Sequence, residues 1–160
     1  DAAKAHVPLV GAHRIEGVEV LVAQGRTPMG SAFAMARQWL EDKELVPSRA
    51  YRPVLVLVSD GEPTDDWQEP LAALKASERG QKATRFAMAI GADADRAMLR
   101  QFTNDLEAPV FEADGVRDIV KFFRAVTMSV MARSTSGSPN TAQPLGMSDD
   151  LEDDLDLDAL

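Results

Sequence analysis

The feature that most restricts the fold of this chain is an unbroken apolar run at residues 54–58, closed by Ser59, Asp60 and Gly61. A strand with one exposed face shows alternating polar and apolar residues, so an unbroken run predicts a strand covered on both faces. A second run, at residues 85–90, is apolar after Arg85 and ends at Gly91. Both runs are typical of strands in the middle of a parallel sheet.

Between these runs, apolar residues recur every three or four positions, which is the spacing of one face of a helix. This spacing predicts helices at about 30–40, 67–79, 98–102 and 118–131. Weaker apolar segments predict strands at 18–22 and 109–112, and an edge strand at 5–10, where Pro8 removes a ladder donor. Strands that alternate with helices indicate an α/β fold with a mostly parallel sheet and helices on both faces.

The composition changes after residue 132. Residues 133–160 begin with Ser, Thr, Gly, Pro and Asn and finish in an acidic stretch. Such a segment cannot bury enough apolar surface to offset the entropy that is lost on ordering. The sequence therefore predicts a folded domain over residues 1–132, followed by a disordered linker and acidic tail over residues 133–160.

Charge and composition exclude several classes of protein. The chain has 17 basic and 26 acidic residues, but seven acids stand at positions 149–158, so the rest of the chain has 17 against 19. Such a nearly neutral body lacks the basic face of a nucleic-acid binder. The absence of cysteine excludes disulfides, a cysteine nucleophile and a thiolate zinc site. With no apolar run of membrane-spanning length and no secretory leader, we expect no membrane contact and a cytoplasmic location.

Two loops follow predicted strands at the sheet edge where α/β proteins bind ligands. Asp60 follows the most apolar strand and offers a hard oxygen ligand for Mg²⁺ or Mn²⁺, an aspartyl nucleophile, or a simple turn residue. In the loop at 25–31, Thr27 offers its hydroxyl to a metal or caps the following helix, with Pro28 at the first helical position. These two roles of Thr27 are compatible.

The neighbouring side chains favour structural roles. Thr64 is expected to cap the helix that follows it, and Asp65 and Asp66 are expected to complement the positive end of that helix. The loop at 25–31 has Ser31 where a phosphate-binding loop has its lysine. Without that cation, nucleotide binding loses its main phosphate contact.

The two loops also carry a family resemblance. The first reads Gly25-Arg26-Thr27-Pro28-Met29-Gly30-Ser31, and the second reads Ser59-Asp60-Gly61-Glu62-Pro63-Thr64-Asp65-Asp66-Trp67. Together they resemble von Willebrand factor type A (vWA) domains, in particular the bacterial TerY-like group associated with tellurium resistance. The resemblance covers about residues 5–131 and implies a Rossmann-like, three-layer α/β/α fold.

The resemblance further implies which residues bind metal. In vWA domains a Thr in the first loop and an Asp at the end of this strand help to form a metal-ion-dependent adhesion site, which carries over to Thr27 and Asp60. The family's leading motif, Asp-x-Ser-x-Ser, has no counterpart in the chain. The family's first strand, helix and second strand are therefore expected to be absent, and the two remaining ligands are expected to hold Mg²⁺ or Mn²⁺ weakly or not at all.

By this resemblance we expect a metal-dependent protein-interaction domain, and not an enzyme, that serves a bacterial stress or tellurite-resistance system. Its metal would accept a carboxylate from an acidic residue of a protein partner. Two alternatives stay open: the same fold binding its partner without metal, and a Mg²⁺-dependent phosphoryl-transfer enzyme with Asp60 as nucleophile. For the acidic tail, the composition favours a solvated segment without a binding role. The alternatives are that a tail carboxylate reaches the metal of its own chain or that the tail binds a basic partner.

Overall fold

The computed structural model describes residues 2–18, 20, 25–103, 110–137 and 140. The elements in order are a short 3₁₀ helix η1 (Ala12–Arg14), α1 (Met29–Glu41), β1 (Val54–Ser59), α2 (Gln68–Ala76), β2 (Thr84–Ile90), α3 (Arg96–Phe102), β3 (Phe111–Ala113) and α4 (Val116–Thr135). The strands form one sheet in the order β1-β2-β3, and Met88 of β2 lies opposite Phe111 of the parallel strand β3. The predicted α/β fold with a parallel sheet is confirmed.

The central and most deeply buried strand is β2. Each of its residues before Ile90 is buried, whereas β1 lies at the edge of the sheet in the described part of the chain and Val56 is 36% exposed. The prediction that the 54–58 run occupies the middle of the sheet is therefore wrong for the described residues. The apolar content of a strand reports how its faces are covered and does not report whether both of its edges are paired.

The weaker strand predictions have different outcomes. A strand is present near 109–112, at Phe111–Ala113, and residue 109 lies outside the described residues. Residues 5–10 form bends and no strand, which corrects the prediction of an edge strand; Pro8 has a fixed φ and no N–H to donate to a ladder. Val18 and Val20 are not in a strand, and the rest of the predicted 18–22 strand lies outside the described residues.

Two helices differ from their predicted bounds. Helix α2 ends at Ala76, because the Ser77 hydroxyl donates to the carbonyl of Leu74 at 3.0 Å and the chain then folds back over the helix end. Gly80 permits this return, since a Cβ there would overlap the same carbonyl oxygen. Helix α4 continues to Thr135, past the residue at which the sequence predicts disorder to begin. None of the helices in the described part has the length and apolar character that a membrane crossing requires.

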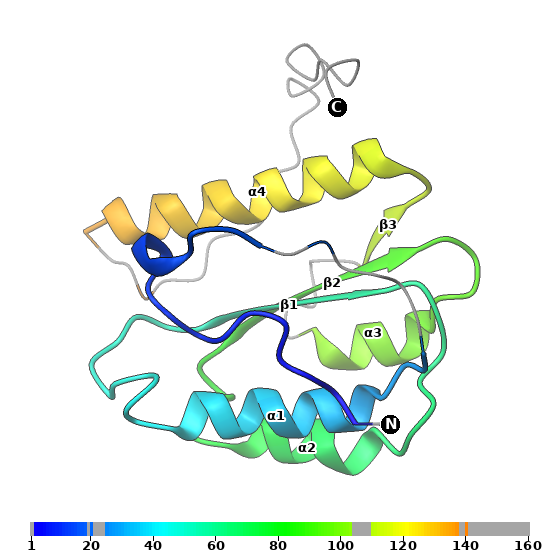
Figure 1. Cartoon of the computed structure of the whole chain (residues 1–160), viewed down its shortest axis with the longest axis horizontal. Coiled ribbons are helices and arrows are strands. Elements are labelled where there is room, and N and C mark those ends of the chain that lie inside the picture. Colours follow the sequence, from blue (N-terminus) through cyan, green and yellow to red (C-terminus); the bar gives the residue numbers. More distant parts are fainter. Residues whose placement is uncertain (1, 19, 21–24, 104–109, 138–139, 141–160) are drawn as a thin grey trace. The chain divides into compact units, whose positions relative to one another are not determined.

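The chain divides into two compact units, of which the first consists of residues 1–55 and 61–84. In this unit α1 and α2 pack side by side (Figure 1). Their apolar faces supply its core, in which Phe33, Leu71 and Leu74 are almost fully buried. The apolar spacing predicts the inward-facing residues of α2 correctly. On α1 it indicates a face at residues 32, 35, 36, 39 and 40, of which only Leu40 is buried, whereas Phe33 lies outside that spacing and faces inward.

The second unit consists of residues 56–60 and 85–160 and contains most of the sheet with α3 and α4. Helix α4 packs on β3, where the rings of Phe111 and Phe122 lie 5.1 Å apart. Arg85 of β2 is buried and donates its Nε hydrogen to the carbonyl of Phe102 at 2.7 Å. Burial lowers the pKa of this guanidinium.

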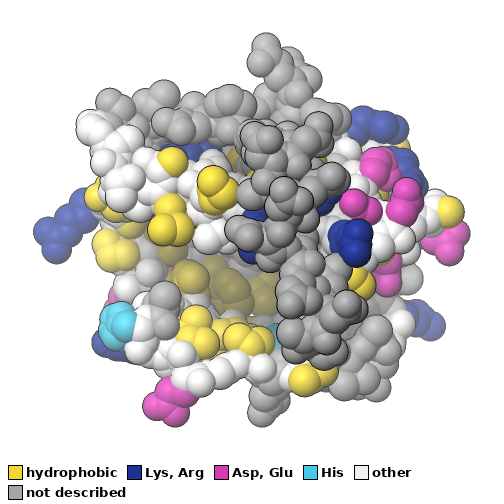
Figure 2. Space-filling view, turned by 90° about the horizontal axis from the view of Figure 1, so that it is seen from above, with side chains coloured by type: hydrophobic (Ala, Val, Ile, Leu, Met, Phe, Trp, Pro, Cys, Tyr) yellow, Lys and Arg dark blue, Asp and Glu magenta, His cyan; other side chains and the backbone are white. Residues whose placement is uncertain are grey.

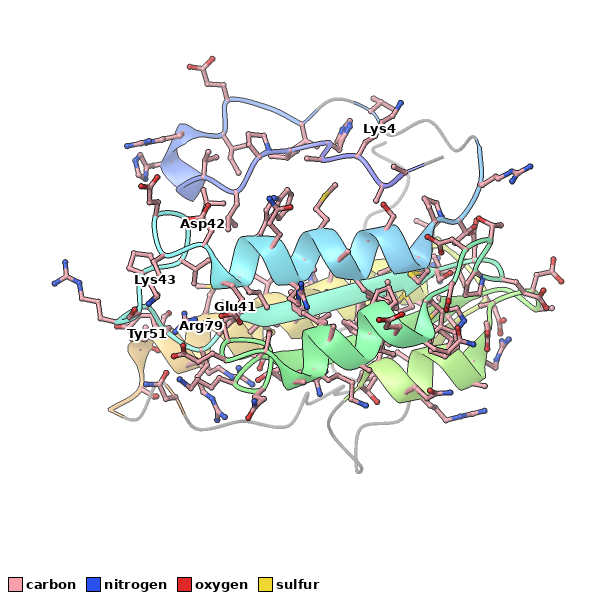
Figure 3. The ribbon with its side chains drawn as sticks, turned by 90° about the horizontal axis from the view of Figure 1, so that it is seen from below. Lys4, Glu41, Asp42, Lys43, Tyr51 and Arg79 are labelled. Carbon is pink, nitrogen blue, oxygen red and sulfur yellow. The ribbon has the colours of Figure 1, made fainter. Side chains whose placement is uncertain are left out.

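Within the first unit, Arg79 joins the ends of α1 and α2 (Figure 3). Its main-chain N–H donates to Oε1 of Glu41 at 2.7 Å. Its buried guanidinium donates to the carbonyl oxygens of Ser48 and Tyr51, each at 3.4 Å. One residue in the turn that follows α2 thus holds the end of α1 and the segment that leads into β1.

Replacing Glu41 by glutamine is expected to lower stability at neutral pH and to weaken the loss of stability in acid. Burial raises the pKa of Glu41, but hydrogen bonds from the Arg79 main chain, the Ser77 hydroxyl and the Gly80 main chain, with the Arg79 charge, outweigh burial and lower it. A lowered folded-state pKa stabilises the fold above the unfolded-state pKa, and the stabilisation is lost as pH falls through the folded-state pKa. Urea unfolding at a series of pH values should show an advantage of wild type over Glu41→Gln that shrinks below a pH of about 4.

The matched control is Glu44→Gln, on an exposed neighbouring residue. This variant should leave the free energy of unfolding nearly unchanged, because the side chain is exposed. A difference between wild type and Glu41→Gln that is independent of pH would contradict the assignment.

Candidate functional site

Within the first unit, three hydrogen bonds join the first turn of α1 and the loop before it to the loop before α2. The main-chain N–H of Thr64 donates to the carbonyl of Thr27 at 2.9 Å. The two carboxylate oxygens of Asp65 accept the main-chain N–H groups of Gly30 at 2.8 Å and Ser31 at 2.9 Å. The two loops that the sequence analysis selects are therefore fixed to each other.

Asp65 caps α1 from across this junction. The N-cap residue of α1 is Pro28, whose side chain cannot accept a hydrogen bond, so the first N–H groups of the helix need an external acceptor. The carboxylate of Asp65 supplies that acceptor and also complements the positive end of α1.

Three sequence predictions are corrected by this arrangement. Thr27 does not cap α1, because its carbonyl accepts N–H groups of Met29 and Thr64 while the N-cap position belongs to the next residue. Thr64 does not cap α2, which has no side-chain cap among the described residues. Asp65 serves α1 and not the helix that follows it in the sequence, because the fold brings α1 within its reach.

Gly30 allows α1 to approach the second loop closely. A Cβ at this buried position would overlap the main-chain carbonyl oxygen of Asp66 and would lie 3.2 Å from the Cα of Trp67. No residue with a side chain fits here without moving one of the two segments. The close approach of α1 to the second loop explains why position 30, the second glycine of the first loop, has no side chain.

Thr27 lies beside the residue that follows Asp60. A Cβ on Gly61 would lie 3.8 Å from Oγ1 of Thr27, and Thr27 is half-buried. Asp60 itself is exposed and follows Ser59, the buried last residue of β1. The assignment of Thr27 and Asp60 as metal ligands stays a prediction.

The donor chemistry suits a weakly held Mg²⁺ or Mn²⁺. A hydroxyl and a carboxylate are hard oxygen ligands, but together they provide a single negative charge. Both oxygens of Asp65, in the same loop as Asp60, already accept N–H groups of α1. Across the described ranges, no group of three or more His, Cys, Asp or Glu side chains is arranged to hold a metal ion. Tight binding of a metal here would need further oxygen atoms from a partner.

Arg96 organises the strand-end loops of the second unit. Its Nη2 atom donates to Oε2 of Glu112 at 2.7 Å and to the carbonyl of Gly91 at 2.9 Å. Its Nη1 atom donates to the carbonyls of Ala92 and Ala94 at 3.1 and 3.2 Å. The ion pair is partly exposed, so it orders these loops more than it stabilises the fold. The sequence analysis missed this residue, because no local spacing links Arg96, at the start of α3, to Glu112 on β3.

The chain is thus an α/β protein in which the loops before α1 and α2 are the two candidate ligand loops. Hydrogen bonds and the close approach at Gly30 hold these two loops together. The family model for the von Willebrand factor type A domain matches residues 14–125, which is well over half of the chain, so the chain belongs to the vWA family. Domains of this family typically mediate protein interactions and often carry a metal-ion-dependent adhesion site. Neither the search of curated proteins nor the search of solved structures gave a match.

Proposed function

We propose that this chain is a protein-interaction module in which Thr27 and Asp60 provide ligands to Mg²⁺ or Mn²⁺ and an acidic residue of the partner completes the site. The observation that carries the proposal is the position of the Thr27 hydroxyl beside Gly61, directly after the exposed Asp60. When bound, the metal would supply an open coordination position for a partner carboxylate. Family membership adds independent support for a binding role.

The residues around the two ligands have defined tasks in this proposal. Thr64 and Asp65 hold the first loop in place, so that Thr27 presents its hydroxyl without a large entropy loss on binding. Asp60 supplies the negative charge. Because that charge is single, the affinity for metal alone is weak and rises when the partner adds its own carboxylate.

Replacing Asp60 by asparagine is expected to weaken Mg²⁺ binding at least about tenfold, because the variant removes the charge of the site. Isothermal titration calorimetry with MgCl₂ on the whole chain measures this effect. Thr27→Val, which removes the hydroxyl at nearly constant shape, should also weaken binding, and Thr27→Ser should retain it.

The matched control is Asp66→Asn, the same change on an exposed residue of the same loop. Its affinity for Mg²⁺ should equal that of wild type. Equal affinities for wild type and Asp60→Asn would refute the assignment of Asp60.

A metal-independent interaction module of the same fold is the second candidate. It is favoured by the occupied carboxylate of Asp65 and by the absence of a group of three acidic or imidazole ligands among the described residues. Binding of a partner that persists in EDTA supports this candidate, whereas binding that is lost in EDTA and restored by Mg²⁺ supports the first. We propose that neither candidate is an enzyme, and phosphate release from a nucleotide or phosphoester would contradict this.

We further propose that the module serves a bacterial stress or tellurite-resistance system, as the TerY-like motif suggests. The support is the Pro63-Thr64-Asp65-Asp66-Trp67 segment, in which Thr64 and Asp65 make the contacts to the first loop. Tellurite sensitivity of a deletion strain, with and without the restored gene, tests this role.

A further inference from the structure

One side of α4 carries large apolar side chains that are exposed to solvent. Hydrophobic side chains are visible at the surface of the molecule (Figure 2). On α4, Val116, Phe123 and Val130 are 64, 45 and 41% exposed and recur every seven residues, so they lie along one side of the helix. We call this side the α4 stripe, which consists of the exposed Val116, Phe123, Val130 and Met131 and the half-buried Val120.

A row of basic residues accompanies the α4 stripe. Arg117, Lys121 and Arg124 each directly follow a member of the stripe, so the turn of the helix places them along one edge of it. The helix has a single acidic residue, Asp118, and its carboxylate accepts the main-chain N–H of Asp114 at 3.0 Å. The surface is therefore apolar along its centre and positive along one edge.

The last ten residues of the same chain have the complementary chemistry. Residues 151–160 contain four leucines and five acidic residues and no basic residue. We propose that this segment binds the α4 stripe of its own chain, with its leucines on the apolar side chains and its carboxylates toward Arg117, Lys121 and Arg124. Burial of the leucines supplies most of the affinity, because partly exposed ion pairs contribute little.

The chain is long enough for this contact. Residues 136–150 separate the end of α4 from the acidic segment. Fully extended, they span about 50 Å, whereas the 20-residue helix is about 30 Å long. A segment tethered in this way has an effective concentration on the order of millimolar, so even a weak intrinsic affinity populates the bound state.

Paramagnetic relaxation enhancement on the whole chain tests the proposal. The sequence contains no cysteine, so Ala159→Cys provides a single attachment point for a nitroxide. In a ¹⁵N-labelled sample at low salt, we expect the amide signals of α4 near Phe123 and Val130 to lose intensity relative to the sample with reduced nitroxide. High salt should reduce the loss only in part.

Two variants separate docking from simple proximity of a tethered segment. Replacing the four leucines of residues 151–160 by serine keeps every charge and should abolish the intensity loss along α4. Phe123→Ser combined with Val130→Ser should do the same from the helix side, and both positions are exposed, so the fold should tolerate the change.

Three results would overturn the proposal. The first is an intensity loss that is unchanged in the leucine variant. The second is a loss centred on Ala32, Met35 and Trp39 of α1, which border an apolar groove in the first unit. The third is a loss at α4 that occurs equally when nitroxide and ¹⁵N are carried by different chains, because the occupant of the stripe would then be a second copy.

Discussion

Replacing Gly30 by alanine is expected to destabilise the chain by about 3 kcal/mol or more. The new Cβ would overlap the main-chain oxygen of Asp66, so α1 must shift away from the second loop. This shift also strains both hydrogen bonds to the Asp65 carboxylate. Helix propensity makes the opposite prediction, because alanine is better than glycine in a helix by about 1 kcal/mol. Urea unfolding therefore tests the sign as well as the size of the effect.

Gly17→Ala is the matched control, since an added Cβ there meets no atom within 4 Å. Its free energy of unfolding should stay close to that of wild type. A Gly30→Ala variant as stable as wild type would contradict the close approach of α1 to the second loop.

The sequence was sufficient to predict most elements of the fold. The apolar runs that became β1 and β2 and the helical spacings of α1, α3 and α4 depend on local periodicity, which a single sequence displays. The apolar run by itself did not predict the position of β1 at the edge of the described sheet, because neighbours in a sheet are set by topology. The expected edge strand at residues 5–10 is absent because Pro8 cannot donate to a ladder, and because a strand needs a partner as well as a suitable composition.

The candidate site was predicted in part. The sequence identified the two loops and the order of their residues, and the vWA resemblance is supported by the family match. It offered Thr27 as a cap of α1 and expected Asp65 to complement the positive end of α2, because capping rules consider neighbours in the sequence. The acceptor used by Gly30 and Ser31 instead lies more than thirty residues away. A contact of that kind depends on tertiary structure and leaves no local signal.

Replacing Asp65 by alanine is expected to lower the free energy of unfolding by about 2 kcal/mol, because two part-buried N–H groups of α1 lose a charged acceptor. Urea unfolding measures the loss, and Asp66→Ala, on an exposed neighbour, should cost far less. The folded Asp65→Ala protein should lose less Mg²⁺ affinity than Asp60→Asn, because Asp65 orders the first loop without giving a ligand to the metal.

Substitutions at Asp60 and at Asp65, in the same loop, are therefore expected to rank in opposite order in their effects on metal affinity and on stability. Asp60→Asn should weaken metal binding and leave stability nearly unchanged, because this carboxylate is exposed. Asp65→Ala should reduce stability and cost less metal affinity than Asp60→Asn, because Asp65 orders the first loop but its oxygens are committed to the end of α1. If Asp65→Ala abolished Mg²⁺ binding in the folded protein while Asp60→Asn did not, the structural and the metal-binding roles of the two acids would have to be exchanged.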